Sequence, residues 1–365
     1  MKKKFLVCAY FAKNIGDDLF LKILFDRYPN AEWDLMTANR NYNEIFKDYN
    51  NVKIIYSYRN FNIGKYSGNL FFKLNELFLK YNKYDGLINI GGSIFMESPA
   101  WKMKKDERQY LLEKFKENNK KTYILGANFG PYKDQNFEKE YRNLFPFYSD
   151  ICFRDKYSFS IFSDLKNVRV APDIVFSLGK SFKHKPKEKK VGFSVINLSK
   201  REGLIEFQRS YTQKIVQFIE KYFEMGYKIN LFSFCESEGD LEIINTILEK
   251  LNNQVKNTVT VISYEGNINS FLEEFKTCEL IIGSRFHSVI LSLLYQQGVY
   301  PLIYSDKTYN VLKDLNMEKV GCCIKHIDTL DINNAISSTF NNKLKNKTIV
   351  KDAEEHFKKL DAFIS

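Results

Sequence analysis

The feature that most constrains the fold of this chain is a regular alternation of short apolar runs with amphipathic segments of helical period. Short apolar runs bounded by turn residues predict buried strands, and apolar residues that recur every three or four positions predict helices. Strands that alternate with helices predict parallel sheets covered by helices on both faces. In the first half of the chain we expect strands at 5–10, 33–36, 52–56, 86–90, 122–125, 151–153 and 168–170, and helices at 17–28, 104–118 and 156–165.

A polar, lysine-rich segment with one proline, at 183–190, interrupts this alternation and predicts a linker. The alternation then restarts, with strands expected at 191–196, 228–234, 259–262, 280–282 and 300–303. A helix is expected at about 204–223, ended by Gly226, because five apolar residues share one face: Tyr211, Ile215, Phe218, Ile219 and Tyr222. We therefore predict an α/β protein with two lobes, 1–182 and 191–340, and a C-terminal tail helix within 341–365.

Two α/β lobes joined by one linker are typical of enzymes. Ligands of open parallel sheets bind near the carboxyl ends of the strands, and ligand pockets occur preferentially at domain interfaces. We therefore predict an enzyme with its substrate in a cleft between the lobes.

Composition narrows the classes of partner. The chain has 365 residues with 55 Lys and Arg against 44 Asp and Glu, a net charge of +11. This surplus suits a nucleic acid, an anionic membrane surface or a phosphorylated substrate, and it equally suits a solvated lysine-rich surface. Basic and aromatic residues do not interleave as in a nucleic-acid-binding module, so we expect no nucleic acid. Four scattered histidines form no metal-ligand cluster.

Location is also constrained by the sequence. No apolar run approaches the roughly 18 residues that span a membrane. The apolar stretch after the N-terminal lysines is too short for a signal peptide, and Lys13 and Asp17 follow it closely. The six cysteines include no Cys-x-x-Cys pair, which fits neither a zinc framework nor a disulfide scaffold. We expect a cytoplasmic protein.

Three candidate turns lie in the first 130 residues, each directly after a predicted strand. Asn14, Gly16 and Asp17 form the first, where glycine permits a tight turn and the following helix offers free N–H groups. Asp17 and Asp18 could instead only cap that helix. The second turn contains Gly91, Gly92 and Ser93, and the third contains Asn128 between Gly126 and Gly130. A purely structural role is open for each of these turns.

Two further turns carry arginine. Arg154 ends an apolar strand, where an arginine is unusual without an anionic partner, and Asp155 either pairs with it or caps the next helix. Asp173 follows the next strand. Arg285 and His287 stand at the start of an apolar helix, where the helix dipole and unpaired N–H groups favour an anion. Arginine suits carboxylate or phosphate, and histidine exchanges protons near neutral pH.

The ordered series of these turns resembles the polysaccharide pyruvyltransferase family over about residues 10 to 310. It comprises Asn14-x-Gly16-Asp17, Gly91-Gly92, Leu125-Gly126 with Gly130-Pro131, Arg154-Asp155 with Ser158, Ala171-Pro172-Asp173, Ser284-Arg285-x-His287 and Tyr304-x-x-Lys307. That family has two Rossmann-like lobes similar to the glycosyltransferase B type. The sequence departs from the family pattern at Ser93, where a third glycine is usual, and at Phe286, where leucine is common.

The resemblance implies transfer of pyruvate from phosphoenolpyruvate to a sugar of a cell-surface polysaccharide, as a cyclic ketal, with phosphate release. It implies His287 and Arg285 as catalytic residues, with the C-terminal lobe on the phosphoenolpyruvate side and the N-terminal lobe on the acceptor side. The expected phosphoenolpyruvate-binding residues are Arg154, Ser284, Arg285, Phe286 and Lys307. The expected acceptor-binding residues are Asn14, Gly16, Asp17, Gly92, Ser93, Asn128 and Asp173.

No metal and no organic cofactor is expected for this chemistry. The acceptor is expected at the cytoplasmic face of the inner membrane, either free or linked to a lipid, and the positive charge would then favour peripheral contact with anionic lipid. The sequence leaves the oligomeric state open. A nucleotide-sugar-dependent glycosyltransferase is the main alternative because it shares the two-lobed fold, and a non-catalytic sugar- or membrane-binding module is a third.

Overall fold

The computed structural model describes residues 2–55, 61–63, 66–68, 79–181 and 187–365. The chain divides into two compact units. Unit 1 comprises the described residues of 1–11, 20–174 and 351–365, and unit 2 comprises those of 12–19 and 175–350. Within the described residues, no helix is both long enough and apolar enough to cross a lipid bilayer.

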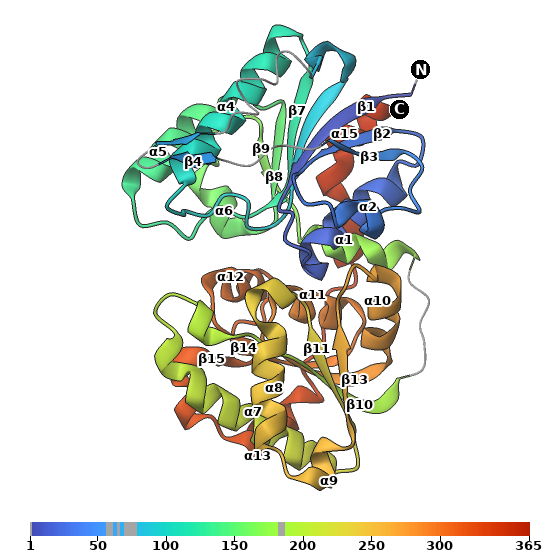
Figure 1. The fold of residues 1–365 in the computed structure, drawn as a ribbon, viewed down its shortest axis with the longest axis vertical. Helices are drawn as coiled ribbons and strands as arrows, with labels where there is room; N and C mark the ends of the chain where they lie inside the picture. The colour runs from blue at the N-terminus through green and yellow to red at the C-terminus, as the bar shows by residue number, and fades with distance from the viewer. Residues whose placement is uncertain (1, 56–60, 64–65, 69–78, 182–186) are drawn as a thin grey trace. The chain divides into compact units, whose positions relative to one another are not determined.

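Unit 1 is built on a seven-stranded parallel sheet in the order β3-β2-β1-β6-β7-β8-β9 (Figure 1). Its central strand β6 is buried at every position, as the apolar sequence 86–90 predicts for a strand covered on both faces. The strands are β1 (Lys4–Ala9), β2 (Glu32–Met36), β3 (Val52–Ile55), β6 (Gly86–Ile90), β7 (Lys121–Ala127), β8 (Asp150–Phe153) and β9 (Val168–Val170). The helices are α1 (Ile15–Arg27), whose first residues belong to unit 2, α2 (Tyr42–Ile45), α4 (Trp101–Glu117), α5 (Gln135–Leu144) and α6 (Lys156–Ile161).

All seven strands expected in the first half are confirmed to within two residues at each end, and residue 56 of the predicted 52–56 lies outside the described residues. The sequence analysis missed a short antiparallel pair, β4 (Phe61–Ile63) and β5 (Tyr66–Gly68). These strands have three residues each, which is too short for a recognisable period.

Unit 2 is built on a six-stranded parallel sheet in the order β12-β11-β10-β13-β14-β15 (Figure 1). The strands are β10 (Glu188–Ser194), β11 (Lys228–Ser233), β12 (Val259–Ser263), β13 (Cys278–Gly283), β14 (Gly298–Ile303) and the short β15 (Cys322–Cys323). The helices are α7 (Gln208–Glu224), α8 (Asp240–Lys250), α9 (Asn253–Lys256), α10 (Ile268–Thr277), α11 (Phe286–Leu294), α12 (Asp306–Asp314) and α13 (Ile332–Thr339). Sequence reasoning expected every strand except β15.

The two faces of the unit 2 sheet pack against different helices. On one face, Phe193 and Leu231 share a core with the predicted apolar face of α7, and all five of those α7 residues are fully buried. On the other face, Phe232 packs against Phe271 and Phe275 of α10, with ring centroids 5.5 and 5.1 Å apart. Successive residues of a strand point to opposite faces of the sheet, and helices cover both faces. Every position of such a strand is therefore apolar.

Two predicted boundaries differ from the structure. Strand β10 begins at Glu188, inside the segment expected to be a linker, because Glu188 pairs with Cys278 of β13 and Lys190 pairs with Lys228 of β11. The charged residues at its start are exposed or half-buried, so they join the ladder without burying charge. Residues 183–186 of the predicted linker lie outside the described residues. Helix α7 begins at Gln208, after a separate 3-10 turn at Ile205–Phe207.

The C-terminal tail forms α14 (Ile349–Glu354), a 3-10 turn at Glu355–Phe357 and α15 (Lys358–Ile364). Residues 351–365 belong to unit 1. The Arg27 guanidinium donates two hydrogen bonds to Asp361, of 3.0 and 2.7 Å, and Phe363 packs against Phe5 of β1 with ring centroids 6.2 Å apart. His356 is fully buried, with Nε2 2.8 Å from the carbonyl oxygen of Pro172.

Burial of His356 makes the stability of unit 1 sensitive to pH. Burial, reinforced by Arg169, lowers the pKa of His356 from 6.5 to about 3. The unfolded chain therefore binds a proton below pH 6.5 that the folded chain does not, and stability falls as the pH decreases through this range. Between pH 7 and pH 5 this histidine is expected to remove about 2 kcal/mol of unfolding free energy.

Urea unfolding followed by tryptophan fluorescence measures this effect, since both tryptophans, Trp33 and Trp101, lie in unit 1. We expect His356→Gln to flatten the dependence of stability on pH between 7 and 5. The exposed His326 provides the control, because His326→Gln is expected to leave that dependence in place. An unchanged dependence in His356→Gln would contradict the prediction.

Candidate functional site

Polar residues in unit 1 gather at the carboxyl ends of four neighbouring strands. Gly92 and Ser93 follow β6, Asn128 follows β7, Arg154 follows β8, and Asp173 follows β9. We call these five residues the Arg154 cluster. Because the strands are parallel and adjacent in the sheet, their ends meet at one edge. Sequence reasoning identified all five residues, and the structure brings them together.

The Arg154 side chain is the centre of this cluster and is almost entirely buried. Nη1 lies 3.1 Å from Asp173 Oδ2, and Nη2 donates a 2.6 Å hydrogen bond to Asn128 Oδ1. Ser93 Oγ donates to the same Asn128 oxygen at 3.3 Å. The buried arginine therefore has the anionic partner that its sequence position requires, and this partner is Asp173.

Two expectations about neighbouring residues are resolved by these contacts. Asp155 was expected either to pair with Arg154 or to cap a helix, and its carboxylate caps α6 by accepting a 2.7 Å hydrogen bond from Ser158 N. A Cβ placed on Gly92 would lie 2.4 Å from Arg154 Nη1. Glycine at this position therefore makes room for the guanidinium.

In unit 2, His287 lies against the first turn of α1. A Cβ placed on Gly16 would lie 1.8 Å from His287 Nδ1, so only glycine admits the imidazole in this position. His287 is partly exposed, whereas its neighbours Phe286 and Ser288 are buried. The structure thus joins two predicted turns that are distant in the sequence and that were assigned to different substrates.

The turn before α1 is held by its own asparagine. Asn14 Oδ1 accepts a 2.9 Å hydrogen bond from Gly16 N, and Ile15 N donates to the carbonyl oxygen of Phe234 at 3.2 Å. Asp18 is buried and accepts a 2.6 Å hydrogen bond from Tyr264. Asn14 therefore supplies a cap at the start of α1, a role that the sequence left open for Asp17 and Asp18, and Asp17 is partly exposed in the first turn of the helix.

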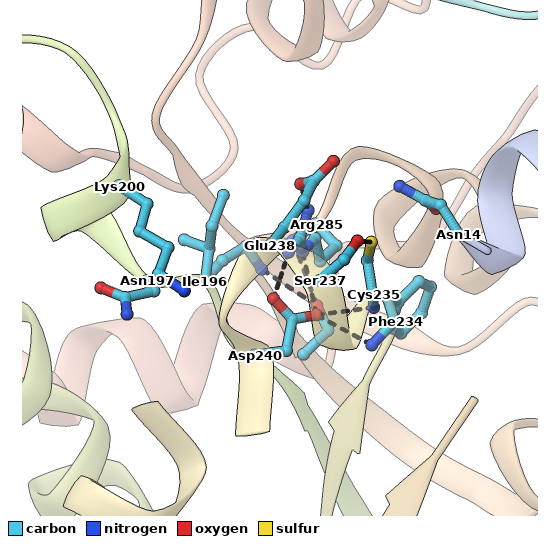
Figure 2. A network of polar contacts seen from close by, with 12 residues as sticks. Asn14, Ile196, Asn197, Lys200, Phe234, Cys235, Ser237, Glu238, Asp240 and Arg285 are labelled. Atoms are coloured by element: carbon cyan, nitrogen blue, oxygen red, sulfur yellow. Dashed lines mark hydrogen bonds and ion pairs between the residues drawn. The ribbon is translucent and has the colours of Figure 1, made fainter. Parts of the chain in front are cut away.

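Arg285 precedes α11 and is held by two carboxylates (Figure 2). Its Nε donates a 3.1 Å hydrogen bond to Asp240 Oδ2, Nη2 pairs with Asp240 Oδ1, and Nη1 pairs with Glu238. Asp240 also accepts hydrogen bonds from Phe234 N at 2.9 Å and Cys235 N at 3.0 Å. Glu238 also pairs with Arg201. We call Arg201, Glu238, Asp240 and Arg285 the Arg285 cluster.

Burial and charge pairing act in opposite directions on the pKa values of this cluster. Burial opposes the charged form of Arg285, but Asp240 and Glu238 outweigh it and raise the pKa of Arg285. Burial alone would raise the pKa of Glu238, but Arg285 and Arg201 lower it to about 2. Glu238 and Arg285 are therefore charged at neutral pH, whereas burial raises the pKa of Asp240 against the opposing effect of Arg285.

Tyr304 lies close enough to the Arg285 cluster and to Lys307 for their positive charges to affect its pKa. Burial would raise the pKa of Tyr304, yet Lys307, Arg285 and Arg201 together lower it. Lys307 Nζ lies 5.8 Å from the ring centroid of Phe286, and Phe286 contacts the His287 ring edge-on with centroids 4.9 Å apart. Ser284 Oγ lies 2.8 Å from Tyr211 Oη, which holds the start of α11 in place.

The predicted donor and acceptor residues do not follow the two units. Of the predicted donor residues, Arg154 lies in unit 1, whereas Ser284, Arg285, Phe286 and Lys307 lie in unit 2, as does His287. Of the predicted acceptor residues, Asn14, Gly16 and Asp17 lie in unit 2 and the other four in unit 1. Their roles in binding remain predictions. Among the described residues, no three His, Cys, Asp or Glu side chains form a group that could hold a metal ion.

Sequence reasoning missed Arg201, Glu238 and Asp240. A signal was present, because Glu238-Gly239-Asp240 follows a predicted strand closely, as the other candidate turns do. Arg201 gave no such signal, since it lies seven residues beyond the end of β10, next to a 3-10 turn at Leu198–Lys200.

Comparison with known protein families identifies the family to which this chain belongs. The family described as polysaccharide pyruvyl transferase matches residues 14–306, which is most of the chain. The chain belongs to this family. The resemblance expected from the ordered turns is therefore confirmed, and both clusters fall within the matched residues.

A curated relative supports the same family. The chain is 22% identical over 272 residues to the amylovoran biosynthesis protein AmsJ of Erwinia amylovora. The matched region covers 68% of this chain and 63% of AmsJ, so the chain spans somewhat less than two thirds of that relative.

Solved structures confirm the two-lobed glycosyltransferase-B-like fold. The UDP-GlcNAc 2-epimerase of Methanocaldococcus jannaschii aligns with a TM-score of 0.61 at 14% identity, covering 99% of this chain and 100% of the epimerase. MnaA of S. aureus, solved with UDP, aligns with a TM-score of 0.62 at 12% identity, covering 100% and 98%. HepE of Anabaena, solved with UDP and glucose, aligns with a TM-score of 0.55 at 10% identity, covering 100% and 99%. These identities speak to the fold alone.

Proposed function

We propose that this protein transfers pyruvate from phosphoenolpyruvate to two hydroxyls of one sugar, forming a cyclic ketal and releasing phosphate. The acceptor is a saccharide of a cell-surface polysaccharide or its lipid-linked precursor. The proposal is carried by membership of the polysaccharide pyruvyl transferase family together with one observation, the convergence of His287, Gly16 and the Arg285 cluster at the strand ends of unit 2.

The proposed reaction balances without a metal or an organic cofactor. Protonation of the methylene carbon of phosphoenolpyruvate makes C2 electrophilic, and the first sugar hydroxyl adds to C2 while losing its proton. The bond between C2 and the phosphate oxygen then breaks. The second hydroxyl adds to C2 and loses its proton, which closes the ketal. Of the two hydroxyl protons, one corresponds to the new methyl hydrogen and the other leaves with phosphate.

His287 is the proposed general acid and base in this sequence. It is the partly exposed side chain at the start of α11, and its imidazole has a fixed place against Gly16. A positioned histidine of this kind typically contributes a factor of roughly 100 to 10,000. Arg285 and Lys307 supply positive charge for the carboxylate and phosphate of the donor, and the N-terminus of α11 adds to it.

The Arg154 cluster is a proposed contributor to substrate binding. Its Arg154 pairs with the Asp173 carboxylate at the strand ends, and polar groups of this kind suit sugar hydroxyls as well as an anion. The surplus of positive charge would favour contact with the anionic inner membrane surface from the cytoplasmic side, where a lipid-linked acceptor is available.

Calorimetry and phosphate release test the proposal. We expect titration with phosphoenolpyruvate to give saturable heat, and we expect UDP-glucose and UDP-GlcNAc to give none. Phosphate release from phosphoenolpyruvate is then expected to depend on an added saccharide acceptor. Saturable binding of a nucleotide sugar without binding of phosphoenolpyruvate would contradict the proposal and favour a glycosyltransferase.

A further inference from the structure

The two carboxylates that hold Arg285 have different surroundings. Asp240 is fully buried, contacts two nitrogens of the guanidinium and accepts two backbone hydrogen bonds. Removing it would leave four donors without their acceptor inside the protein. Asp240 is therefore a permanent partner that fixes the position of Arg285.

Glu238 is held much less firmly. Its side chain is 21% exposed, and it lies in the three-residue 3-10 turn Glu236–Glu238, directly before Gly239, whose φ is 89°. Its carboxylate pairs with Nη1 of Arg285 and with Nη2 of Arg201. If this side chain turned out into water, its charge would be rehydrated, which offsets much of the cost of leaving the arginines.

Arg201, the second arginine that pairs with Glu238, has a hydrogen-bond donor that no described residue uses. Among the described residues, its Nε is buried and has no hydrogen-bond partner. Its guanidinium carbon lies 5.8 Å from the ring centroid of Tyr304. A buried donor without a partner is costly and marks a position where a ligand oxygen would be stabilised.

We infer that Arg201 and Arg285 form an anion-binding subsite. In the absence of the donor substrate, the Glu238 carboxylate occupies the position of the substrate anion. This inference rests on the proposed function only in naming phosphoenolpyruvate as the anion. The carboxylate or phosphate of the donor replaces the Glu238 carboxylate between the two guanidiniums. Arg201 is then a donor-binding residue, and Asp240 is a positioning residue that keeps Arg285 in place during the exchange.

The charges favour this exchange. With Glu238 in place, Arg201 and Arg285 face two carboxylates, so the four groups together carry no net charge. With Glu238 withdrawn, two guanidiniums face Asp240 alone, and the net charge is one positive. Guanidinium groups bind carboxylate and phosphate through the same paired geometry, so either donor group can take the vacated position.

Titration calorimetry of the full chain tests the inference with two probes, phosphoenolpyruvate and inorganic phosphate. We expect Glu238→Gln to bind both probes about tenfold more tightly than wild type, because the competing charge is gone. Arg201→Gln is expected to bind both about tenfold more weakly. Glu236→Gln removes an exposed charge from the same turn and is expected to bind like wild type.

The outcomes separate this inference from the proposed function. If phosphoenolpyruvate fails to bind wild type, the proposed function fails, and the change in phosphate affinity between wild type and Glu238→Gln still decides the inference. Weaker or equal binding by Glu238→Gln, in a variant with wild-type circular dichroism, would overturn the inference. If Glu238→Gln does not fold, unchanged affinity in Arg201→Gln would overturn it equally.

Discussion

We expect His287→Ala to lower the turnover number for acceptor-dependent phosphate release from phosphoenolpyruvate by a factor of roughly 100 to 10,000. The physical reason is the loss of the proposed proton carrier at the start of α11. Because His287 is partly exposed, its removal leaves no large buried cavity, and the thermal unfolding temperature should stay close to that of wild type. Stopped assays of phosphate release give the rate, and the exposed His326→Ala provides the control. Wild-type turnover in His287→Ala would remove the histidine from the mechanism.

Gly16→Ala tests the position of the same histidine without changing its chemistry. Alanine is ordinarily favoured over glycine in a helix by about 1 kcal/mol. Here its methyl group would occupy the place of His287 Nδ1, at 1.8 Å, so the imidazole must move. We expect this variant to lose turnover as His287→Ala does while its affinity for phosphoenolpyruvate changes little. Unaltered turnover would show that the contact between Gly16 and His287 has no part in the reaction.

Asp240→Asn is expected to destabilise unit 2 by about 3–5 kcal/mol. The substitution leaves Arg285 buried with Glu238 as its remaining carboxylate, and it replaces an acceptor of two backbone hydrogen bonds by an amide that can satisfy them only in part. Urea unfolding followed by circular dichroism measures the loss. Hydrogen–deuterium exchange in β13 and α11 should locate it in unit 2.

Glu242→Gln provides the matched control for Asp240→Asn. Glu242 lies two residues further along α8 and pairs with Lys200 at the surface, where ion pairs contribute little. We expect this variant to unfold like wild type. Equal stability of Asp240→Asn and Glu242→Gln would show that Asp240 does not hold the buried arginine.

The strands and most helices follow from the sequence because they depend on local patterns. The apolar run 86–90 is short and uninterrupted, and it forms the buried central strand β6. The five apolar residues on one face of α7 are buried together for the same reason. The start of β10 was predicted wrongly because its charged residues resemble a linker, and only pairing with β11 and β13 makes them part of a strand.

The side-chain interaction partners of the candidate residues could not be predicted from local sequence patterns. Arg154 needed an anion, and the sequence offered the adjacent Asp155 for this role but not the more distant Asp173. Strand β9 pairs with β8, so Asp173 is carried to the end of the strand that carries Arg154, while Asp155 faces its own helix as a cap. The choice depended on strand order, which is a property of the sheet.

The sequence alone determined the parallel α/β class, the family and the turns in which polar residues follow strands. Hydrophobic period and residue order are properties of neighbouring residues in the chain, so they can be recognised without knowledge of the fold. Only the tertiary structure decided that Gly16 makes room for His287, that Asp173 pairs with Arg154, and that Asp240 and Glu238 hold Arg285. The reason is that parallel strands distant in the sequence bring their carboxyl ends to a common edge, so each side chain meets partners that its own neighbourhood in the chain does not contain.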